Sequence, residues 1–119
     1  MTPQVLIIED DPDHITIFSE AFRLEGFEVK VVVNGAEAFS RLEKVMPSVI
    51  VLDLHLPDMS GDNILAYIQS EARFNQTHII LTSADESMAD AIKTNNTEVV
   101  AKPFSFAKLR ALAARSKGE

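Results

Sequence analysis

Five short aliphatic runs, separated by longer segments of mixed polarity, constrain the fold of this chain more than any other feature. Continuous apolar runs of this length are typical of β-strands that are covered on both faces. Their alternation with amphipathic segments is typical of repeated βα units on a parallel sheet. The expected strands are residues 5–8, 29–33, 49–52, 79–81 and, more weakly, 99–101. The sequence therefore predicts an α/β fold, a (βα)₅ doubly wound parallel sheet.

The polarity of the runs predicts where each strand lies in the sheet. The first, third and fourth runs contain no polar residue, as expected for strands at the centre of a sheet. The second run contains Lys30, and the fifth follows Thr97 and Glu98. Because an edge strand has one side in contact with water, we expect the second and fifth strands at the two edges.

The segments between the runs carry apolar residues at helical spacing, so each predicts one amphipathic helix. These positions are Ile15, Phe18 and Phe22; Phe39, Leu42 and Met46; Ile64, Ile68 and Ala72; Met88 and Ile92; and Leu109, Leu112 and Ala113. Helix start signals precede the first three: Asp11-Pro12, Asn34-Gly35 and Ser60-Gly61. Together with the strands, they complete the (βα)₅ pattern.

Length and charge exclude several classes of protein. The chain has 119 residues, which suits a single domain spanning residues 1–119, and its formal net charge of −7 argues against direct binding of nucleic acid. It has no cysteine, which excludes disulfides and thiolate metal sites and fits a reducing compartment. No apolar run is long enough for a membrane span or a secretion signal. We therefore expect a cytoplasmic domain that binds neither nucleic acid nor membrane.

Polar side chains follow four of the five predicted strands. They are Glu9, Asp10 and Asp11 after the first, Asp53 after the third, Thr82 and Ser83 after the fourth, and Lys102 after the fifth. Each has an ordinary structural explanation when taken alone, such as a helix cap, a turn residue or a surface lysine. In a doubly wound sheet, however, the ligand site lies at the carboxyl ends of the strands. We therefore expect these side chains to meet at one edge.

Carboxylates gathered at one edge need a positive partner, because like charges raise one another's pKa. Only oxygen ligands and Lys102 are available there, so the expected ion is Mg²⁺, with Mn²⁺ as a substitute. The three histidines, at positions 14, 55 and 78, are scattered, and this argues against zinc. Without the metal, at least one of Glu9, Asp10 and Asp53 is expected to have a raised pKa, whereas Asp11 is interpreted as the helix cap before Pro12.

A carboxylate held beside a metal ion and facing a lysine and a hydroxyl is suited to phosphoryl transfer. Asp53 can attack phosphorus as the nucleophile, while the metal and Lys102 screen charge on the transferring oxygens. Either Thr82 or Ser83 can then donate a hydrogen bond to a phosphoryl oxygen. The two hydroxyls are adjacent in the sequence, and spacing from Asp53 does not separate them.

These residues resemble the receiver domains of two-component response regulators over essentially the whole chain. The resemblance rests on four segments in the family's order: VLIIEDD (5–11), VIVLDLHLPDMSG (49–61), IILTS (79–83) and VAKPF (100–104). It implies a flavodoxin-like strand order 2-1-3-4-5. It also implies that the chain is a phosphoaccepting switch and not an enzyme.

The resemblance also implies a role for each site residue. Asp53 is expected to accept phosphate from a histidine kinase or a phosphotransfer protein. Asp10 is expected to bind Mg²⁺ directly, Glu9 through water and His55 through its backbone carbonyl. Lys102 is expected to contact the phosphoryl group and to precede Pro103 in a cis peptide bond, and Thr82 is the hydroxyl that the motif favours. Phosphorylation is then expected to change the loop after strand 4 and the helix 4/helix 5 surface, and the helix 4/strand 5/helix 5 face is also a candidate for dimerisation.

Two departures from the family pattern affect this switch. The segment between Thr82 and Lys102 is about two residues shorter than is typical, which predicts a short or irregular fourth helix. Val99 stands where the family usually has an aromatic residue, so a readout by ring rotation is not expected. His55 and Ala84 lie at the two positions that tune dephosphorylation in the family, where a side chain can either slow or assist hydrolysis.

Two alternative functions stay open at this point. A phosphatase of the haloacid dehalogenase class also uses a nucleophilic aspartate, but that class has an acid two residues further on, where this chain has His55. A degenerate receiver that serves only for docking is the other alternative. The sequence identifies neither the cognate kinase nor the output, and it leaves open whether the chain acts alone or within a longer protein.

Overall fold

Five parallel strands form one sheet in the order β2-β1-β3-β4-β5, as the resemblance predicts. The computed structural model describes residues 2–83 and 96–117. In chain order the elements are β1 (Gln4–Ile8), α1 (Pro12–Leu24), β2 (Glu28–Val32), α2 (Gly35–Leu42), β3 (Val49–Asp53), α3 (Gly61–Ser70), the 3₁₀ turn η1 (Ala72–Phe74), β4 (His78–Ser83), β5 (Thr97–Ala101) and α5 (Phe106–Arg115). The three unbroken aliphatic runs are the central strands, and the two runs with flanking or internal charge are the edges, as expected.

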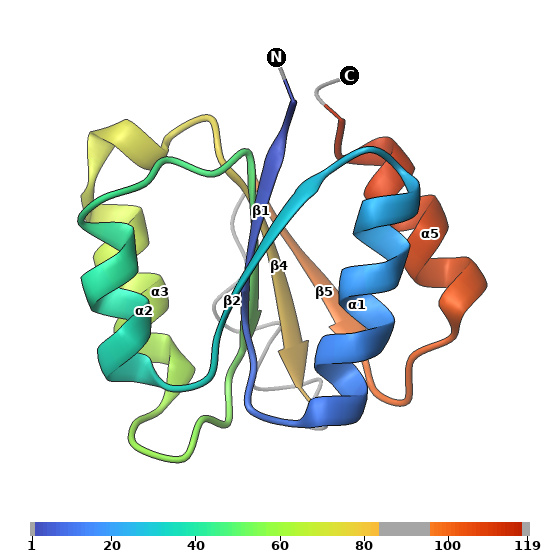
Figure 1. Cartoon of the computed structure of the whole chain (residues 1–119). Coiled ribbons are helices and arrows are strands. Elements are labelled where there is room, and N and C mark those ends of the chain that lie inside the picture. The colour runs from blue at the N-terminus through green and yellow to red at the C-terminus, as the bar shows by residue number, and fades with distance from the viewer. Residues whose placement is uncertain (1, 84–95, 118–119) are drawn as a thin grey trace.

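Helices cover both faces of the sheet, which explains why the central strands are apolar throughout (Figure 1). Helices α2 and α3 lie on one face, and α1 and α5 lie on the other. Successive side chains of a strand point to opposite faces, so Leu6 and Ile8 pack toward α2 and α3, whereas Val5 and Ile7 pack toward α1 and α5. All five residues of β3 are buried. The sheet is thus the shared wall of two apolar cores.

Capping side chains explain where the first two helices begin. Asp11 Oδ1 accepts hydrogen bonds from the backbone N–H groups of Asp13 at 2.9 Å and His14 at 3.4 Å. Asn34 Oδ1 accepts from the N–H of Glu37 at 2.8 Å. Such caps satisfy N–H groups that have no partner within the helix. These two start signals are confirmed, and α3 also begins at the predicted Gly61, although the Ser60 side chain makes no capping hydrogen bond there.

Two predicted helix ends are wrong. The apolar spacing that included Met46 extended the second helix too far, because α2 ends at Leu42 and the Met46 side chain is 63% exposed. Pro47 follows Met46, and the residue before a proline is disfavoured in helical conformation. Helix α3 ends at Ser70, so Ala72 belongs to η1 and not to the helix.

The remaining helix prediction falls outside the described residues. The spacing of Met88 and Ile92, and with it the expected short fourth helix, lies within residues 84–95. Val99, at the position where the family usually has an aromatic residue, is partly buried against the core on the α2/α3 side of the sheet.

The start of α3 approaches the end of β3 so closely that only glycine fits there. A Cβ atom at Gly61 would lie 2.6 Å from the carbonyl oxygen of Asp53 and 2.7 Å from Leu54 Cα. The N–H of Gly61 donates to the carbonyl of Leu54 at 2.9 Å, which closes the loop between β3 and α3. This close approach positions the loop that follows Asp53.

Candidate functional site

The predicted site residues Glu9, Asp10, Asp53, Thr82 and Lys102 come together at the carboxyl edge of the sheet. Figure 1 shows the sheet whose strands end at this edge. Asp53 is the last residue of β3 and pairs in register with Thr82 of β4. Parallel pairing aligns the strand ends, so polar residues that follow separate strands become neighbours. Convergence at this edge is confirmed.

Three carboxylates form a cluster at this edge. Oxygen atoms of Glu9, Asp10 and Asp53 all lie within 4.8 Å of one another. Glu9 is 1% exposed and Asp53 is 2% exposed, whereas Asp10 is open to solvent. The donor set consists of oxygen atoms alone, which suits a hard divalent cation such as Mg²⁺. The residues present therefore fit the expected metal.

Glu9 is held differently at its two carboxyl oxygens. Oε2 accepts hydrogen bonds from the backbone N–H groups of Asp10 at 3.1 Å and Asp11 at 3.2 Å. Oε1 is buried and has no hydrogen-bond partner among the described residues. Burial of the carboxyl group, together with the adjacent Asp53 carboxylate and its negative charge, raises the pKa of Glu9 to about 8. The expectation that one of the clustered carboxyls has a raised pKa is met at Glu9.

Asp11 has a separate role from the other two carboxylates of its segment. Its hydrogen bonds to the first backbone N–H groups of α1 lower its pKa, the largest contribution coming from the N–H of Asp13. A carboxylate stabilised in its charged form at a helix N-terminus acts as a cap. The capping role of Asp11 agrees with the sequence interpretation, and the metal-binding roles of Glu9 and Asp10 stay predictions.

Asp53 is held between backbone and lysine. Its Oδ1 accepts a hydrogen bond from the N–H of His55 at 3.0 Å. The same Oδ1 lies 3.5 Å from Lys102 Nζ, and the Lys102 side chain is 21% exposed. Lys102 precedes Pro103 in a cis peptide bond, as the resemblance implies. The ammonium group of Lys102 therefore reaches the Asp53 carboxylate from the segment that follows β5, whereas Glu9 and Asp10 come from the segment that follows β1.

The two hydroxyls at the end of β4, the strand that pairs with β3, occupy different environments. Thr82 is fully buried, and its Oγ1 has no hydrogen-bond partner among the described residues. Ser83 is one residue nearer the edge, and its Oγ lies 3.3 Å from Nε2 of His55. The choice of Thr82 stays a prediction, as does the role of the His55 carbonyl. Ala84 lies outside the described residues.

Two contacts of the site region were not foreseen from the sequence. His14 Nδ1 lies 3.5 Å from Oε1 of Glu9. Asp58, in the loop after β3, accepts hydrogen bonds from the N–H groups of Gly35 at 2.7 Å and Ala36 at 3.0 Å, and these lower its pKa. Asp58 therefore ties the loop that carries His55 to the start of α2. The spacing of residues in the sequence predicts neither contact, because each contact joins residues from separate structural elements.

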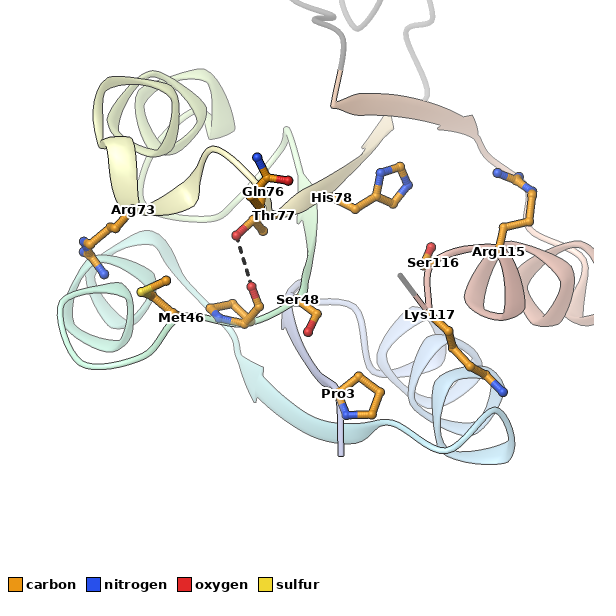
Figure 2. Close-up of a pocket in the computed structure, with 11 residues that line it drawn as sticks. Pro3, Met46, Ser48, Arg73, Gln76, Thr77, His78, Arg115, Ser116 and Lys117 are labelled. Carbon is orange, nitrogen blue, oxygen red and sulfur yellow. Dashed lines mark hydrogen bonds between the residues drawn. The ribbon is translucent and has the colours of Figure 1, made fainter. Parts of the chain in front are cut away.

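A depression of about 660 Å³ lies at the opposite end of the sheet, next to the amino ends of the strands (Figure 2). Its cationic side chains are already engaged. Arg115 pairs with Glu98 at 2.8 Å, Lys117 Nζ lies 3.4 Å from Glu25, and Arg73 donates to the carbonyl of Leu42 at 2.7 Å. Because these cationic groups already have partners within the protein, the depression is a weak candidate for an anion-binding site. The carboxyl edge is the stronger candidate.

The comparisons with known proteins agree with this geometry. The family model of the response regulator receiver domain matches residues 5–114. The chain belongs to this receiver family. Among curated relatives, the transcriptional regulatory protein TrcR of Mycobacterium tuberculosis is 34% identical over 119 residues, covering 95% of this chain and 46% of that protein. The phosphate regulon regulator PhoB of Rhizobium meliloti is 28% identical over 100% of this chain and 56% of that protein.

Solved structures lead to the same family. The receiver domain of sensor histidine kinase PA1611 from Pseudomonas aeruginosa is 25% identical, with a TM-score of 0.84 and full coverage of both chains. That crystal structure contains a magnesium ion in its active-site cleft. A receiver domain from Vibrio parahaemolyticus, of a protein described as a Luxo repressor, is 27% identical with a TM-score of 0.81 and covers 98% of this chain.

The chain is thus a receiver domain of the two-component systems. It spans about half the length, 46–50%, of five relatives from the genus Mycobacterium. Within the part that the structure describes, no helix is both long and apolar enough to cross a membrane.

Proposed function

We propose that this receiver domain accepts a phosphoryl group on Asp53 from a histidine kinase or a histidine-containing phosphotransfer protein. The proposal rests on one observation above all. Asp53 is a buried carboxylate in contact with a lysine, 3.5 Å away, and it belongs to a cluster of three acids. The acids provide a metal site and the lysine provides a fixed positive charge, so the nucleophile has both aids to phosphoryl transfer beside it.

In the reaction, an Asp53 carboxylate oxygen forms a bond to phosphorus as the bond between phosphorus and the donor's imidazole nitrogen breaks. The imidazole leaves with the electron pair of that bond. Asp10, Asp53 and the backbone carbonyl of His55, with Glu9 acting through water, would hold Mg²⁺, which would supply charge neutralisation on the phosphoryl oxygens. Lys102 Nζ adds a second positive charge from the β5 side, and the N–H of His55 holds the nucleophilic carboxylate in place. Mn²⁺ is expected to substitute for Mg²⁺.

The domain then acts as a switch and not as an enzyme with an external product. Phosphorylation is proposed to rearrange the loop after β4 and the face formed by β5 and α5, changing the affinity for an output domain or protein. This face can also serve for dimerisation. The fourth helix that is expected to contribute to this face falls in residues 84–95, outside the described residues. The proposed location is the cytoplasm, where the phosphodonors of such systems act.

Incubation with acetyl phosphate and Mg²⁺ is expected to add one phosphoryl group to the wild-type protein, and Asp53→Asn should remove the adduct. Intact-mass spectrometry measures both. Asp62→Asn, the same substitution at an exposed position on α3, serves as the matched control and should leave the adduct unchanged. A wild type without the adduct, or an undiminished adduct in Asp53→Asn, contradicts the proposal. Sustained turnover of a phosphomonoester would indicate a phosphatase instead.

Substitution can separate the two candidate hydroxyls. Thr82→Val keeps the shape of the buried side chain and removes its hydroxyl, and Ser83→Ala removes the neighbouring one. If Thr82 is the switch hydroxyl, Thr82→Val is expected to accept phosphate but to lose most of the amide chemical-shift change on β5 and α5, because no donor meets the phosphoryl oxygen. Ser83→Ala should keep that change. NMR spectra before and after phosphorylation measure it, and the reverse pattern assigns the role to Ser83.

A further inference from the structure

His14 lies on the first turn of α1, beside the carboxylate cluster of Glu9, Asp10 and Asp53. Its Nδ1 is 3.5 Å from Oε1 of Glu9 and 3.7 Å from Oδ2 of Asp11, whose other oxygen caps α1. His14 Nδ1 and Glu9 Oε1 are both buried, and neither has a hydrogen-bond partner among the described residues. Buried polar atoms are normally paired. Two such atoms opposite each other need only a small approach to satisfy both.

The contact of His14 is with Oε1 of Glu9, the carboxylate oxygen that accepts no backbone hydrogen bond. Oε2 is already held by two backbone N–H groups, from Asp10 and Asp11. A carboxylate held at one oxygen can still turn about its last bond, whereas one held at both oxygens presents a fixed direction to a ligand. His14 Nδ1 stands opposite the oxygen that would otherwise be unrestrained.

The imidazole ring is itself fixed by the loop that carries Lys102. His14 packs edge-on against Phe104, with 4.9 Å between ring centroids and 74° between planes. Phe104 packs in the same manner on Phe18, a fully buried residue of α1. Phe104 follows Lys102 by two residues, across the cis peptide bond to Pro103. One aromatic stack therefore connects the acidic side of the site to its lysine side.

We infer that His14 is a positioning residue for the metal site: its Nδ1 holds the Glu9 carboxylate in the direction that Mg²⁺ binding requires, and Phe104 holds the His14 ring. This inference rests on the proposed function, because it assumes that Glu9 serves a metal ion. Groups beyond the direct metal ligands commonly change metal affinity by about 10–100-fold when they are removed, and because Glu9 acts through water, the effect of His14 is expected at the lower end of this range. A ring that only fills space between α1 and Phe104 would change stability and leave metal affinity alone.

Two substitutions separate the nitrogen from the ring. His14→Phe keeps a ring against Phe104 and removes Nδ1. His14→Asn removes most of the ring and keeps an N–H group near the position of Nδ1. We expect Mg²⁺ affinity, measured by isothermal titration calorimetry, to fall about tenfold in His14→Phe and to stay within about threefold of wild type in His14→Asn. His78→Phe, at the opposite end of the sheet where His78 contacts Glu98, is the matched control and should bind Mg²⁺ as the wild type does.

Thermal unfolding of the metal-free variants reports their folding separately. A measurement on the wild type alone adds a test that needs no variant: in ¹⁵N NMR spectra, Nδ1 of His14 is expected to show the shift of a protonated, hydrogen-bonded nitrogen when Mg²⁺ is bound. A folded His14→Phe protein that binds Mg²⁺ as the wild type does, or an Nδ1 without a proton in the Mg²⁺-bound state, overturns the role of His14 and leaves the proposed function intact. A wild type that binds no Mg²⁺ overturns the metal site in the proposed function itself.

Discussion

Replacing Lys102 with alanine is expected to slow phosphorylation of Asp53 by about a hundredfold or more, since removing one preorganised group that stabilises transition-state charge typically costs that much. Lys102 Nζ lies 3.5 Å from the Asp53 carboxylate, where the oxygens of the incoming phosphoryl group would collect negative charge. Lys102→Arg should recover part of the rate because it keeps the charge. The rate of adduct formation, followed by intact mass at fixed acetyl phosphate and saturating Mg²⁺, measures the effect.

The control for this prediction is another lysine in the same part of the chain. Lys108 is exposed on the first turn of α5, and Lys108→Ala should be phosphorylated at the wild-type rate. If Lys102→Ala were phosphorylated as fast as Lys108→Ala, the lysine would have no part in the reaction, and the contact with Asp53 would be only an ion pair of the resting protein.

Replacing Glu9 with glutamine is expected to stabilise the metal-free protein by about 1–3 kcal/mol at pH 8. Burial and the neighbouring Asp53 raise the pKa of Glu9 from 4.5 to about 8. Between these two values the folded protein holds a proton that the unfolded chain has released, so the free energy of unfolding falls as the pH rises through this window. A neutral glutamine side chain at this position carries no such cost, and the advantage of the variant should therefore disappear near pH 5.

Thermal unfolding in the presence of a chelator measures this effect, with about 3–5 °C expected for each kcal/mol in a domain of this size. Glu20→Gln, on the exposed face of α1, is the control and should follow the wild type at every pH. Saturating Mg²⁺ should reverse the order, because a ligand that binds the folded state stabilises it and the variant binds more weakly. Equal pH profiles for wild type and Glu9→Gln would mean that Glu9 is not buried beside Asp53.

The opposing effects of Glu9 on stability and on metal binding have one physical origin. A carboxylate that is buried among other carboxylates is costly to ionise in the absence of a cation. The same arrangement provides a preformed set of oxygen ligands when the cation arrives. The same buried carboxylates therefore lower the stability of the metal-free protein and favour the binding of a cation.

The positions of the site residues were predictable because they depend on topology and not on detailed packing. An apolar run that ends in Asp53 must place this carboxylate at the carboxyl edge of a parallel sheet, and Glu9, Asp10 and Lys102 follow other strands at the same edge. Asp11 was also predictable as a cap, because an aspartate before a proline and an amphipathic segment is a local signal.

Features that depend on how elements pack were not predictable in the same way. Helical spacing included Met46 in the second helix, although the chain leaves the helix at Leu42. The contact of Asp58 with the start of α2 joins residues 22 and 23 positions apart. Nothing in the local pattern of either segment indicates such a pairing.

The sequence by itself determined the type of fold, the edge of the sheet that carries the chemistry and the acids and lysine that meet there, because strand periodicity and parallel pairing leave few alternatives. Only the tertiary structure decided which of those acids is buried, how Glu9 is held and that His14 reaches it. Burial and hydrogen bonding depend on side chains that approach from α1 and from the loop after β5, as Phe104 does against His14. Their distances are set by packing between elements, and no local pattern in a single segment encodes them.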